Sequence, residues 1–400
     1  MPPAKLENPH PPAMPKKPVI ASYVSDFLKS DMLHVYRQVT GLQNLEPWVF
    51  THKRENEARF PFPKKRLVVL PKPKLRWWRR WVHKNLKKAP WHLYTWEVRH
   101  ALLELERAEA KLLHIYFGHT AIHFLPLIKA CPHPVVVSFH GADAGVDVHK
   151  PSHLSPLREV FAAADLIQAR SQSLADDLIK LGCPAEKVRV QRTSIPLEEW
   201  TFTPREIPAD GVWRLFQSCR LIAKKGLDLT LDAFATVHRE FPNATLTIAG
   251  DGPLKEELEA HAARLGVAES VRFAGFLDQA DLRKEVAASH FFLHPSRTTS
   301  DGNREGVPNA MLEAMASGAT VIATKHGGIP EAVESGESGW LVGENDGAGL
   351  SAGLLALIKD PQRSQAMALQ ARARVEAMFD RSTNIKVLED CYRGLMEGAS

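Results

Sequence analysis

The chain has 400 residues, of which 44% are hydrophobic and 24% are charged, and its formal net charge is +5. This balance is typical of a soluble globular protein, and the length exceeds that of one ordinary core, so we predict two domains. The four cysteines, Cys131, Cys183, Cys219 and Cys391, are far apart. Their spacing argues against a disulfide framework or a zinc site and indicates the reducing cytoplasm.

The first 18 residues contain seven prolines and no apolar run. They predict a disordered lead-in and not a secretory signal, which needs an apolar centre. No apolar run elsewhere approaches the roughly 20 residues that a helix needs to cross a bilayer.

Residues 19–196 alternate short apolar runs with segments of helical spacing, and we expect them to form the first domain. Strands are predicted at 19–23, 47–51, 67–70, 112–117, 135–139, 166–169 and 188–191. Strands this apolar are buried on both faces, as in a parallel sheet that helices cover on each side. Right-handed crossovers make such a sheet doubly wound.

Residues 60–96 interrupt this pattern with eleven Lys and Arg, no Asp or Glu, and five interleaved tryptophans. Three interpretations are open. The segment could be a solvated charged face, it could bind nucleic acid through phosphates and stacked bases, or it could lie on an anionic membrane.

Residues 197–211 contain two prolines and no periodicity, which predicts an interdomain linker. A second doubly wound domain is expected over 212–378, with strands at 214–217, 245–249, 271–273, 291–294, 320–323 and 339–342. Ligands of this architecture bind at the carboxyl ends of the strands, so we expect a cleft between two facing sheets. Residues 379–400 predict a C-terminal helix that could pack back on the first domain.

The segment 297–318 reads as a polar loop that turns into a short helix. The amides of Gly306 and Val307 would lie at the positive N-terminal end of that helix. Such a helix end is a common binding site for phosphate. Glu305 and Glu313 could accept hydrogen bonds from sugar hydroxyls. Solvated glutamates on a surface helix are the alternative for this segment alone.

Other polar residues also follow predicted strands. Arg220 and Lys225 share one strand-to-helix loop, where two cations can hold a diphosphate as it leaves. His140 follows an apolar strand in the first domain. Weaker candidates in the second predicted domain are Gly250, Asp251, Gly252, Gly275, Phe276, Leu277 and Asn303. In the first predicted domain they are His119 and Asp143. No convincing metal-binding cluster appears, and no loop fits an ATP or dinucleotide cradle.

Together, Arg220 to Lys225-Gly226, Gly250-Asp-Gly-Pro253, Glu305-x7-Glu313 and Gly327-Gly-Ile-Pro-Glu331 resemble the layout of family 4 glycosyltransferases. The nearest likeness is to enzymes of exopolysaccharide and colanic-acid type. The resemblance implies a retaining hexosyltransferase of GT-B fold, with two Rossmann-like domains and no catalytic metal or other cofactor.

The resemblance also implies the roles of individual residues. Arg220 and Lys225 would hold the diphosphate of a UDP- or GDP-sugar, Glu305 the hydroxyls of the donor sugar, and Glu313 the ribose. His140 would touch the donor sugar near the reacting carbon, and the backbone of 275–277 would read the base. One departure is the loop after the first strand, where residues 23–27 replace the two glycines that touch the diphosphate in many relatives.

The acceptor implied by the resemblance is a saccharide or a lipid-linked saccharide, in the synthesis of envelope polysaccharide. We therefore favour the membrane interpretation of residues 60–96, with the protein peripheral on the inner face and no nucleic acid bound. A sugar-nucleotide 2-epimerase of similar fold and a non-catalytic binding protein remain alternatives.

Overall fold

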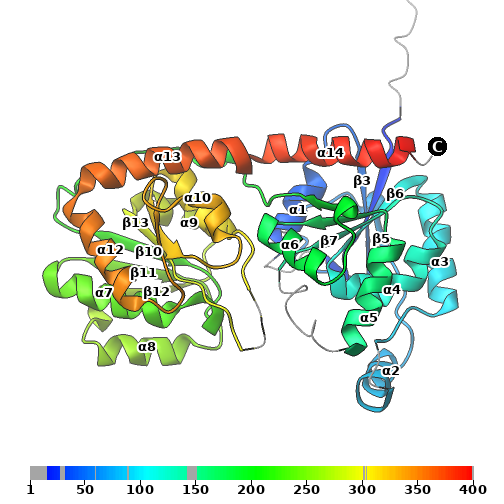
Figure 1. Cartoon of the computed structure of the whole chain (residues 1–400), viewed down its shortest axis with the longest axis horizontal. Coiled ribbons are helices and arrows are strands. Elements are labelled where there is room, and N and C mark those ends of the chain that lie inside the picture. The colour runs from blue at the N-terminus through cyan, green and yellow to red at the C-terminus, as the bar shows by residue number, and fades with distance from the viewer. Residues whose placement is uncertain are drawn as a thin grey trace, which may run out of the picture.

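A computed structural model describes residues 16–27, 32–58, 60–87, 90–141, 151–300, 302 and 304–398. Most of the predicted lead-in lies outside these ranges. Two α/β domains lie side by side, and two long C-terminal helices run along one edge of both (Figure 1). In the described residues, no helix combines the length and the apolar character that a membrane span requires.

The N-terminal domain is built on a seven-stranded parallel sheet in the order β5-β3-β1-β6-β7-β8-β9. Its strands are β1 (Val19–Tyr23), β3 (Glu46–Thr51), β5 (Leu67–Val69), β6 (Ala110–Tyr116), β7 (Val135–Phe139), β8 (Leu166–Ala169) and β9 (Val188–Val190). A two-residue pair, β2 (Asp26–Phe27) with β4 (Lys53–Arg54), lies beside it. The helices are α1 (Leu33–Thr40), α2 (Arg76–Val82), α3 (Thr95–Arg107), α4 (Gly118–Ala130), α5 (Pro151–Ala163) and α6 (Gln172–Lys180).

The central strands of this sheet are buried on both faces. Ala21, Leu113 and Val137 pack into a core with α3 to α6. The alternate residues Ile20 and Leu112 pack against the last helix of the chain. This two-sided burial is why the strands read as continuous apolar runs in the sequence.

The C-terminal domain repeats the plan with a six-stranded parallel sheet in the order β12-β11-β10-β13-β14-β15. Its strands are β10 (Arg214–Ser218), β11 (Thr245–Ala249), β12 (Val271–Gly275), β13 (Phe291–His294), β14 (Thr320–Thr324) and β15 (Trp340–Val342). The helices are α7 (Leu227–Glu240), α8 (Lys255–Arg264), α9 (Gln279–Ala288), α10 (Asn309–Ser317), α11 (Ile329–Ala332) and α12 (Gly347–Lys359). The sequence placed the strands of both sheets to within a few residues.

The last two helices connect the domains. Helix α13 (Pro361–Phe379) packs in the C-terminal domain, and α14 (Arg381–Gly398) crosses to the N-terminal sheet. There the Glu389 carboxylate accepts hydrogen bonds from the amides of Gln43 and Asn44 at 2.6 and 2.7 Å. The Tyr392 hydroxyl lies 2.6 Å from Nδ1 of the buried His114.

Where the chain passes from one domain to the other, its two crossings lie together. The amide of Ile195 donates to the carbonyl of Phe379, and the amide of Arg381 donates to the carbonyl of Ile195, both at 3.0 Å. The predicted linker, 197–211, follows the first crossing and holds a single 3-10 turn, Leu197–Glu199.

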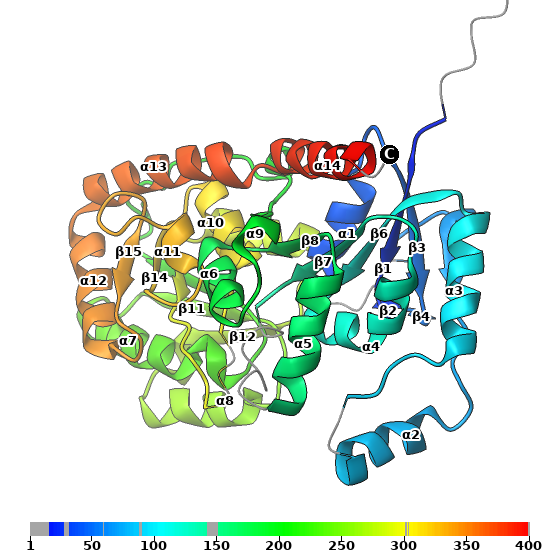
Figure 2. The same ribbon diagram turned by 45° about the vertical axis from the view of Figure 1, so that its right-hand side comes forward.

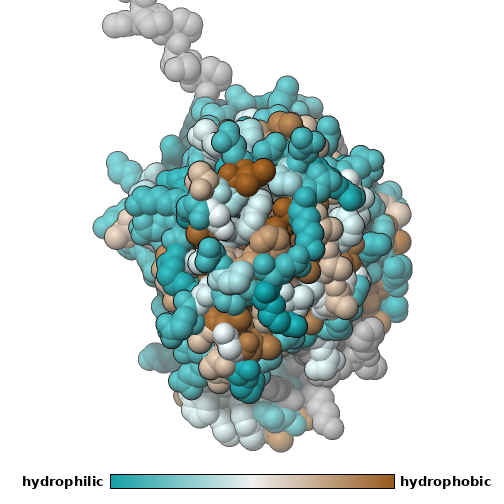
Figure 3. All heavy atoms as spheres, turned by 90° about the vertical axis from the view of Figure 1, so that its left-hand side faces the viewer, coloured by the Kyte–Doolittle hydropathy of each residue, from teal (hydrophilic) through white to brown (hydrophobic). Residues whose placement is uncertain are grey.

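The basic segment departs from the rest of the domain in shape. Helix α2 and the π-helical turn His83–Lys87 that continues it form an arm that projects from the body of the protein (Figure 2). No regular structure was predicted for this stretch, because its charges and tryptophans follow no single period. The outer end of the C-terminal domain, by contrast, is mainly hydrophilic with scattered apolar residues (Figure 3).

Candidate active site

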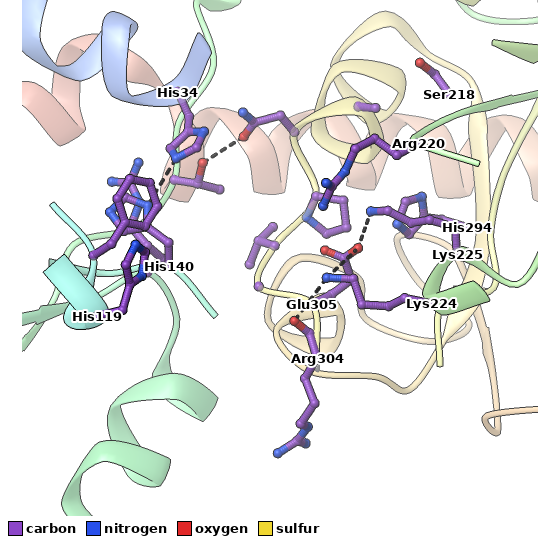
Figure 4. Close-up of a pocket in the computed structure, with 18 of the residues that line it drawn as sticks. His34, His119, His140, Ser218, Arg220, Lys224, Lys225, His294, Arg304 and Glu305 are labelled. Carbon is purple, nitrogen blue, oxygen red and sulfur yellow. Dashed lines mark hydrogen bonds and ion pairs between the residues drawn. The ribbon is translucent and has the colours of Figure 1, made fainter. Parts of the chain in front are cut away.

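A cavity of about 660 Å³ lies between the domains, where the carboxyl ends of both sheets face each other. Figure 4 shows His34, His119 and His140 on the N-terminal wall, opposite Arg220, Lys225 and Glu305 on the C-terminal wall. The lining of this cavity is thus rich in cationic and imidazole side chains, with Glu305 as the one carboxylate among the described lining residues.

Glu305 lies between two lysines of the loop before α7. Its carboxylate is bonded to the ammonium of Lys225, and the ammonium of Lys224 lies 3.7 Å away. Burial raises the pKa of Glu305, but the charges of Lys225 and Lys224 lower it by more than burial raises it. The pKa of Glu305 therefore lies well below its ordinary value. Glu305 is therefore a buried carboxylate that stays ionised and accepts hydrogen bonds.

The backbone at Glu305 is fixed from the opposite side. Its amide donates to Nε2 of His326 at 2.9 Å, and Nδ1 of His326 lies 2.7 Å from the carboxylate of Glu344. Gly327 has φ of +53°, and a Cβ built there would overlap the carbonyl of Glu305. The Gly327-Gly328 turn thus allows two loops to approach closely.

Two other glycines shape the loop that carries Arg220. A Cβ at Gly250, which has φ of +128°, would overlap the carbonyl of Cys219, and one at Gly252 would overlap the backbone of Leu221. The amide of Leu221 donates to the carbonyl of Asp251 at 2.9 Å. The Gly250-Asp-Gly252 turn therefore supports the Arg220 loop, and it does not line the cavity.

The N-terminal wall is held by a chain of imidazoles. Nε2 of His140 lies 3.0 Å from the hydroxyl of Ser138, and Nδ1 of His140 lies 3.1 Å from Nε2 of His34. Burial, with Arg170 nearby, lowers the pKa of His140 well below its ordinary value. His140 is consequently neutral near pH 7 and has one ring nitrogen that can accept a proton.

Glu313 is buried outside the cavity lining. Its carboxylate receives a hydrogen bond at 3.0 Å from the guanidinium of Arg37, on α1 of the other domain, and both side chains are less than 10% exposed. Arg37 also donates to Oε1 of Gln279 at 3.2 Å. Burial raises the pKa of Glu313, and the Arg37 charge opposes that shift.

The structure thus brings together part of the predicted site. His119, His140, Arg220, Lys225, Glu305, Gly306 and Val307 line the cavity. Gly250, Asp251, Gly252, Gly275, Phe276, Leu277 and Glu313 do not, and Phe276 is 53% exposed to solvent. Asn303 and Asp143 lie outside the described residues.

Sequence reasoning missed five cationic or imidazole residues that line the same cavity. Lys224 stands next to Lys225 and could have been chosen with it. The others are His34, His153, Arg170 and His294. Arg170 and His294 come directly after or at the end of a predicted strand, the position that marked His140. In the described residues, no group of His, Cys, Asp or Glu could hold a metal ion.

Comparisons with known proteins decide the family. Residues 33–199 match the family model described as Glycosyltransferase Family 4, and residues 201–374 match the one described as Glycosyl transferases group 1. The chain is 32% identical to the amylovoran biosynthesis glycosyltransferase AmsK of Erwinia amylovora, over 72% of this chain and 70% of that protein. The chain belongs to glycosyltransferase family 4.

Two more relatives support this assignment. The putative colanic acid biosynthesis glycosyltransferase WcaL of Escherichia coli (strain K12) is 32% identical over 65% of this chain and 64% of its own length. A GDP-mannose-dependent monoacylated alpha-(1-6)-phosphatidylinositol monomannoside mannosyltransferase of Corynebacterium glutamicum is 30% identical over 72% of this chain and 79% of its own length. These matches confirm the predicted family and glycosyltransferase function, in preference to an epimerase or a non-catalytic binding protein.

The crystal structure of Anabaena Alr3699/HepE in complex with UDP superposes on this glycosyltransferase with a TM-score of 0.75. The match covers 94% of this chain and 100% of that one, at 21% identity. It confirms the predicted GT-B fold, with two Rossmann-like domains around a central cleft.

The approach of Gly327 to the Glu305 loop gives a stability prediction. Gly327→Ala should lower the free energy of unfolding by about 2–4 kcal/mol, because it adds both an unfavourable φ and a backbone overlap. Urea denaturation of the purified glycosyltransferase would measure this. Gly266→Ala is the control, since Gly266 has φ of +73° and nothing within 4 Å of the added Cβ, and should cost only about 1 kcal/mol. Equal losses would contradict the close approach.

Proposed function

We propose that this glycosyltransferase moves a hexosyl group from a UDP- or GDP-sugar to a hydroxyl of a saccharide or lipid-linked saccharide, with retention of configuration, in envelope polysaccharide synthesis. The observation that carries the proposal is the cluster of Arg220, Lys225 and Glu305 in one interdomain cavity. A diphosphate needs adjacent cations and a sugar needs hydrogen-bond acceptors, and this cluster offers both.

In this proposal the donor's diphosphate lies against the loop that carries Arg220 and Lys225. The bond between the anomeric carbon and the phosphate oxygen breaks, and negative charge develops on the leaving phosphate. Cations already placed beside the leaving phosphate stabilise that charge. The amides of Gly306 and Val307, just before α10, can add hydrogen bonds to the phosphate or sugar.

The carboxylate of Glu305 accepts hydrogen bonds from hydroxyls of the donor sugar. Because Lys224 and Lys225 keep this carboxyl ionised, it orients the sugar without acting as an acid. Attack by the acceptor hydroxyl from the face that the phosphate leaves retains the anomeric configuration. The hydroxyl proton passes to the departing phosphate oxygen, so no separate base is required.

The names of the relatives support a nucleotide-sugar donor and a cell-envelope product. AmsK and WcaL are named for amylovoran and colanic acid biosynthesis, and the Corynebacterium relative is named GDP-mannose-dependent. The HepE structure contains UDP.

Arg37 already bonds one oxygen of the carboxylate that we assign to the ribose hydroxyls. Its guanidinium donates to Oε1 of Glu313. We therefore propose that Arg37 and the nucleotide compete for Glu313, and that the ion pair is exchanged when a nucleotide enters between the domains.

The projecting arm supports a membrane-bound acceptor. The tryptophans of α2 face solvent, with Trp77 69% and Trp78 49% exposed. A groove of about 1000 Å³ connects this arm, through Trp81, with Ser25 after β1. Exposed indoles beside arginines suit the headgroup layer of an anionic membrane, so we propose peripheral binding at the inner face through α2.

The cationic cluster predicts the loss of catalysis. Arg220→Ala, Lys225→Ala and Glu305→Ala should each lower kcat by about 10²-fold or more, because each removes charge stabilisation or sugar positioning. Sugar transfer would be measured with the nucleotide sugar that most raises the Tm. Lys255→Ala, on the exposed face of α8, should leave kcat unchanged. Near-normal turnover in all three cavity variants would refute the proposal.

The Arg37–Glu313 ion pair predicts tighter nucleotide binding when Arg37 is removed. Arg37→Ala should lower the Kd of UDP or GDP by about tenfold, which corresponds to about 1.4 kcal/mol, because Glu313 becomes available. Isothermal titration calorimetry would report it, with Arg272→Ala, which breaks an ion pair within the C-terminal domain, as the unchanged control. Weaker binding in Arg37→Ala would place Arg37 among the nucleotide ligands instead.

The arm predicts selective membrane binding. The full-length protein should sediment with vesicles of anionic phosphatidylglycerol and not with those of neutral phosphatidylcholine. Replacing Trp77, Trp78 and Trp81 with alanine should weaken the binding about tenfold or more. A double variant, Leu369→Ala with Val387→Ala, removes exposed apolar side chains from α13 and α14 and should bind normally. Equal sedimentation with both vesicle types would eliminate the membrane site.

A further inference from the structure

We propose that Arg170 binds an anionic group on the acceptor, so that the acceptor of this glycosyltransferase carries a carboxylate or a phosphate near the hydroxyl that is glycosylated. This inference rests on the proposed transfer reaction. It adds a substrate class and a binding residue on the wall opposite the proposed diphosphate site.

Arg170 is placed by the fold at the active-site edge. It follows β8 at the carboxyl end of the strand, and it lines the interdomain cavity. The residue is only 7% exposed. Arg170 is thus a largely buried cation that still forms part of the cavity lining.

The surroundings of Arg170 are neutral. Its Nη1 donates to Oε1 of Gln38 at 2.9 Å. Among the described residues, Gln38 is the one hydrogen-bond partner of the Arg170 guanidinium. Its other electrostatic neighbours are the phenols of Tyr116 and Tyr392 and the imidazoles of His114 and His140, whose pKa values burial and the Arg170 charge lower. Burial lowers the pKa of Arg170 to about 10, which is still far above neutral pH, so the residue remains a cation.

A buried cation without a carboxylate partner is unfavourable unless a ligand compensates its charge. The C-terminal wall has its own carboxylate, Glu305, among its lysines. The described lining residues of the N-terminal wall include no carboxylate. The uncompensated charge therefore lies on the acceptor side of the cavity.

A nearby helix end does not offer the same site. The amides of Gln172 and Ser173, at the start of α6, donate to the Glu331 carboxylate of the other domain, both at 2.9 Å. That anion site is occupied by the protein itself. Arg170, two residues earlier, keeps its remaining N–H donors for a ligand.

A guanidinium binds carboxylate and phosphate oxygens alike, in a bidentate geometry. The acceptor anion could accordingly be the carboxylate of a sugar acid or the phosphate that links a saccharide to a lipid. Neutral saccharides lack the partner that Arg170 requires.

Binding can be tested without any transfer assay. With UDP saturating, methyl glucuronide and inorganic phosphate should each raise the Tm of the full-length protein, and methyl glucoside should not. The larger of the two anion shifts identifies the source, carboxylate or phosphate. Absence of both shifts in the unaltered protein would overturn the proposal.

Two variants assign the binding to Arg170. Arg170→Gln removes the charge. Gln38→Glu keeps the size of Gln38 but places a carboxylate on the existing 2.9 Å contact. This carboxylate neutralises the charge of Arg170. The variant also provides a second test if Arg170→Gln fails to fold. Both should weaken anion binding by about tenfold or more and leave the UDP shift intact. Arg158→Gln, a charge change at an exposed position of α5, is the matched control.

The outcomes separate this inference from the proposed function. Anion shifts that persist in both variants would overturn the role of Arg170, whatever the result with UDP. If UDP gives no shift in the unaltered protein, the proposed donor site fails, while loss of anion binding in the variants without UDP still supports the Arg170 site. In transfer assays, Gln38→Glu should raise KM for an anionic acceptor far more than it lowers kcat.

Discussion

The active site depends on one buried electrostatic contact, that of Glu305 with Lys224 and Lys225. Buried charges are tolerated only when they compensate each other closely, so the two loops that carry them must meet with little freedom. Glycines make that meeting possible, since Gly226 fits against the carbonyl of Pro295 and Gly327 against that of Glu305. The same contact keeps the Glu305 carboxylate ionised beside two lysines, where a sugar diphosphate would need both kinds of group.

The cavity exists only in the arrangement of the two domains described here, and polar contacts maintain it. Arg304 donates to Asp177 at 3.0 Å, Thr193 donates to Asn309 at 2.7 Å, and Glu331 accepts from the start of α6. Water can replace such contacts at low net cost. The domains can therefore separate to admit a donor without exposing a hydrophobic core.

The fold and several residues of both cavity walls could be predicted from the sequence, because they follow from local patterns. Continuous apolar strands predict a parallel sheet. A polar residue that follows such a strand must lie at the carboxyl edge of the sheet. This reasoning identified Arg220, Lys225 and His140. The pairing of Arg37 with Glu313 joins residues 276 positions apart and leaves no local signal. The boundary between α12 and α13 could have been predicted, since Asp360 and Pro361 form a capped helix start.

The paired crossings at Ile195 and Asp380 have a mechanical consequence. Because the two connecting segments are hydrogen-bonded to each other, they form a single hinge, and each domain can turn about it as a rigid body. Helix α13 moves with one sheet and α14 with the other, so the bend concentrates at the short junction between these helices. A rotation about that junction would displace atoms in proportion to their distance from it, so the far rims of the cleft would move furthest.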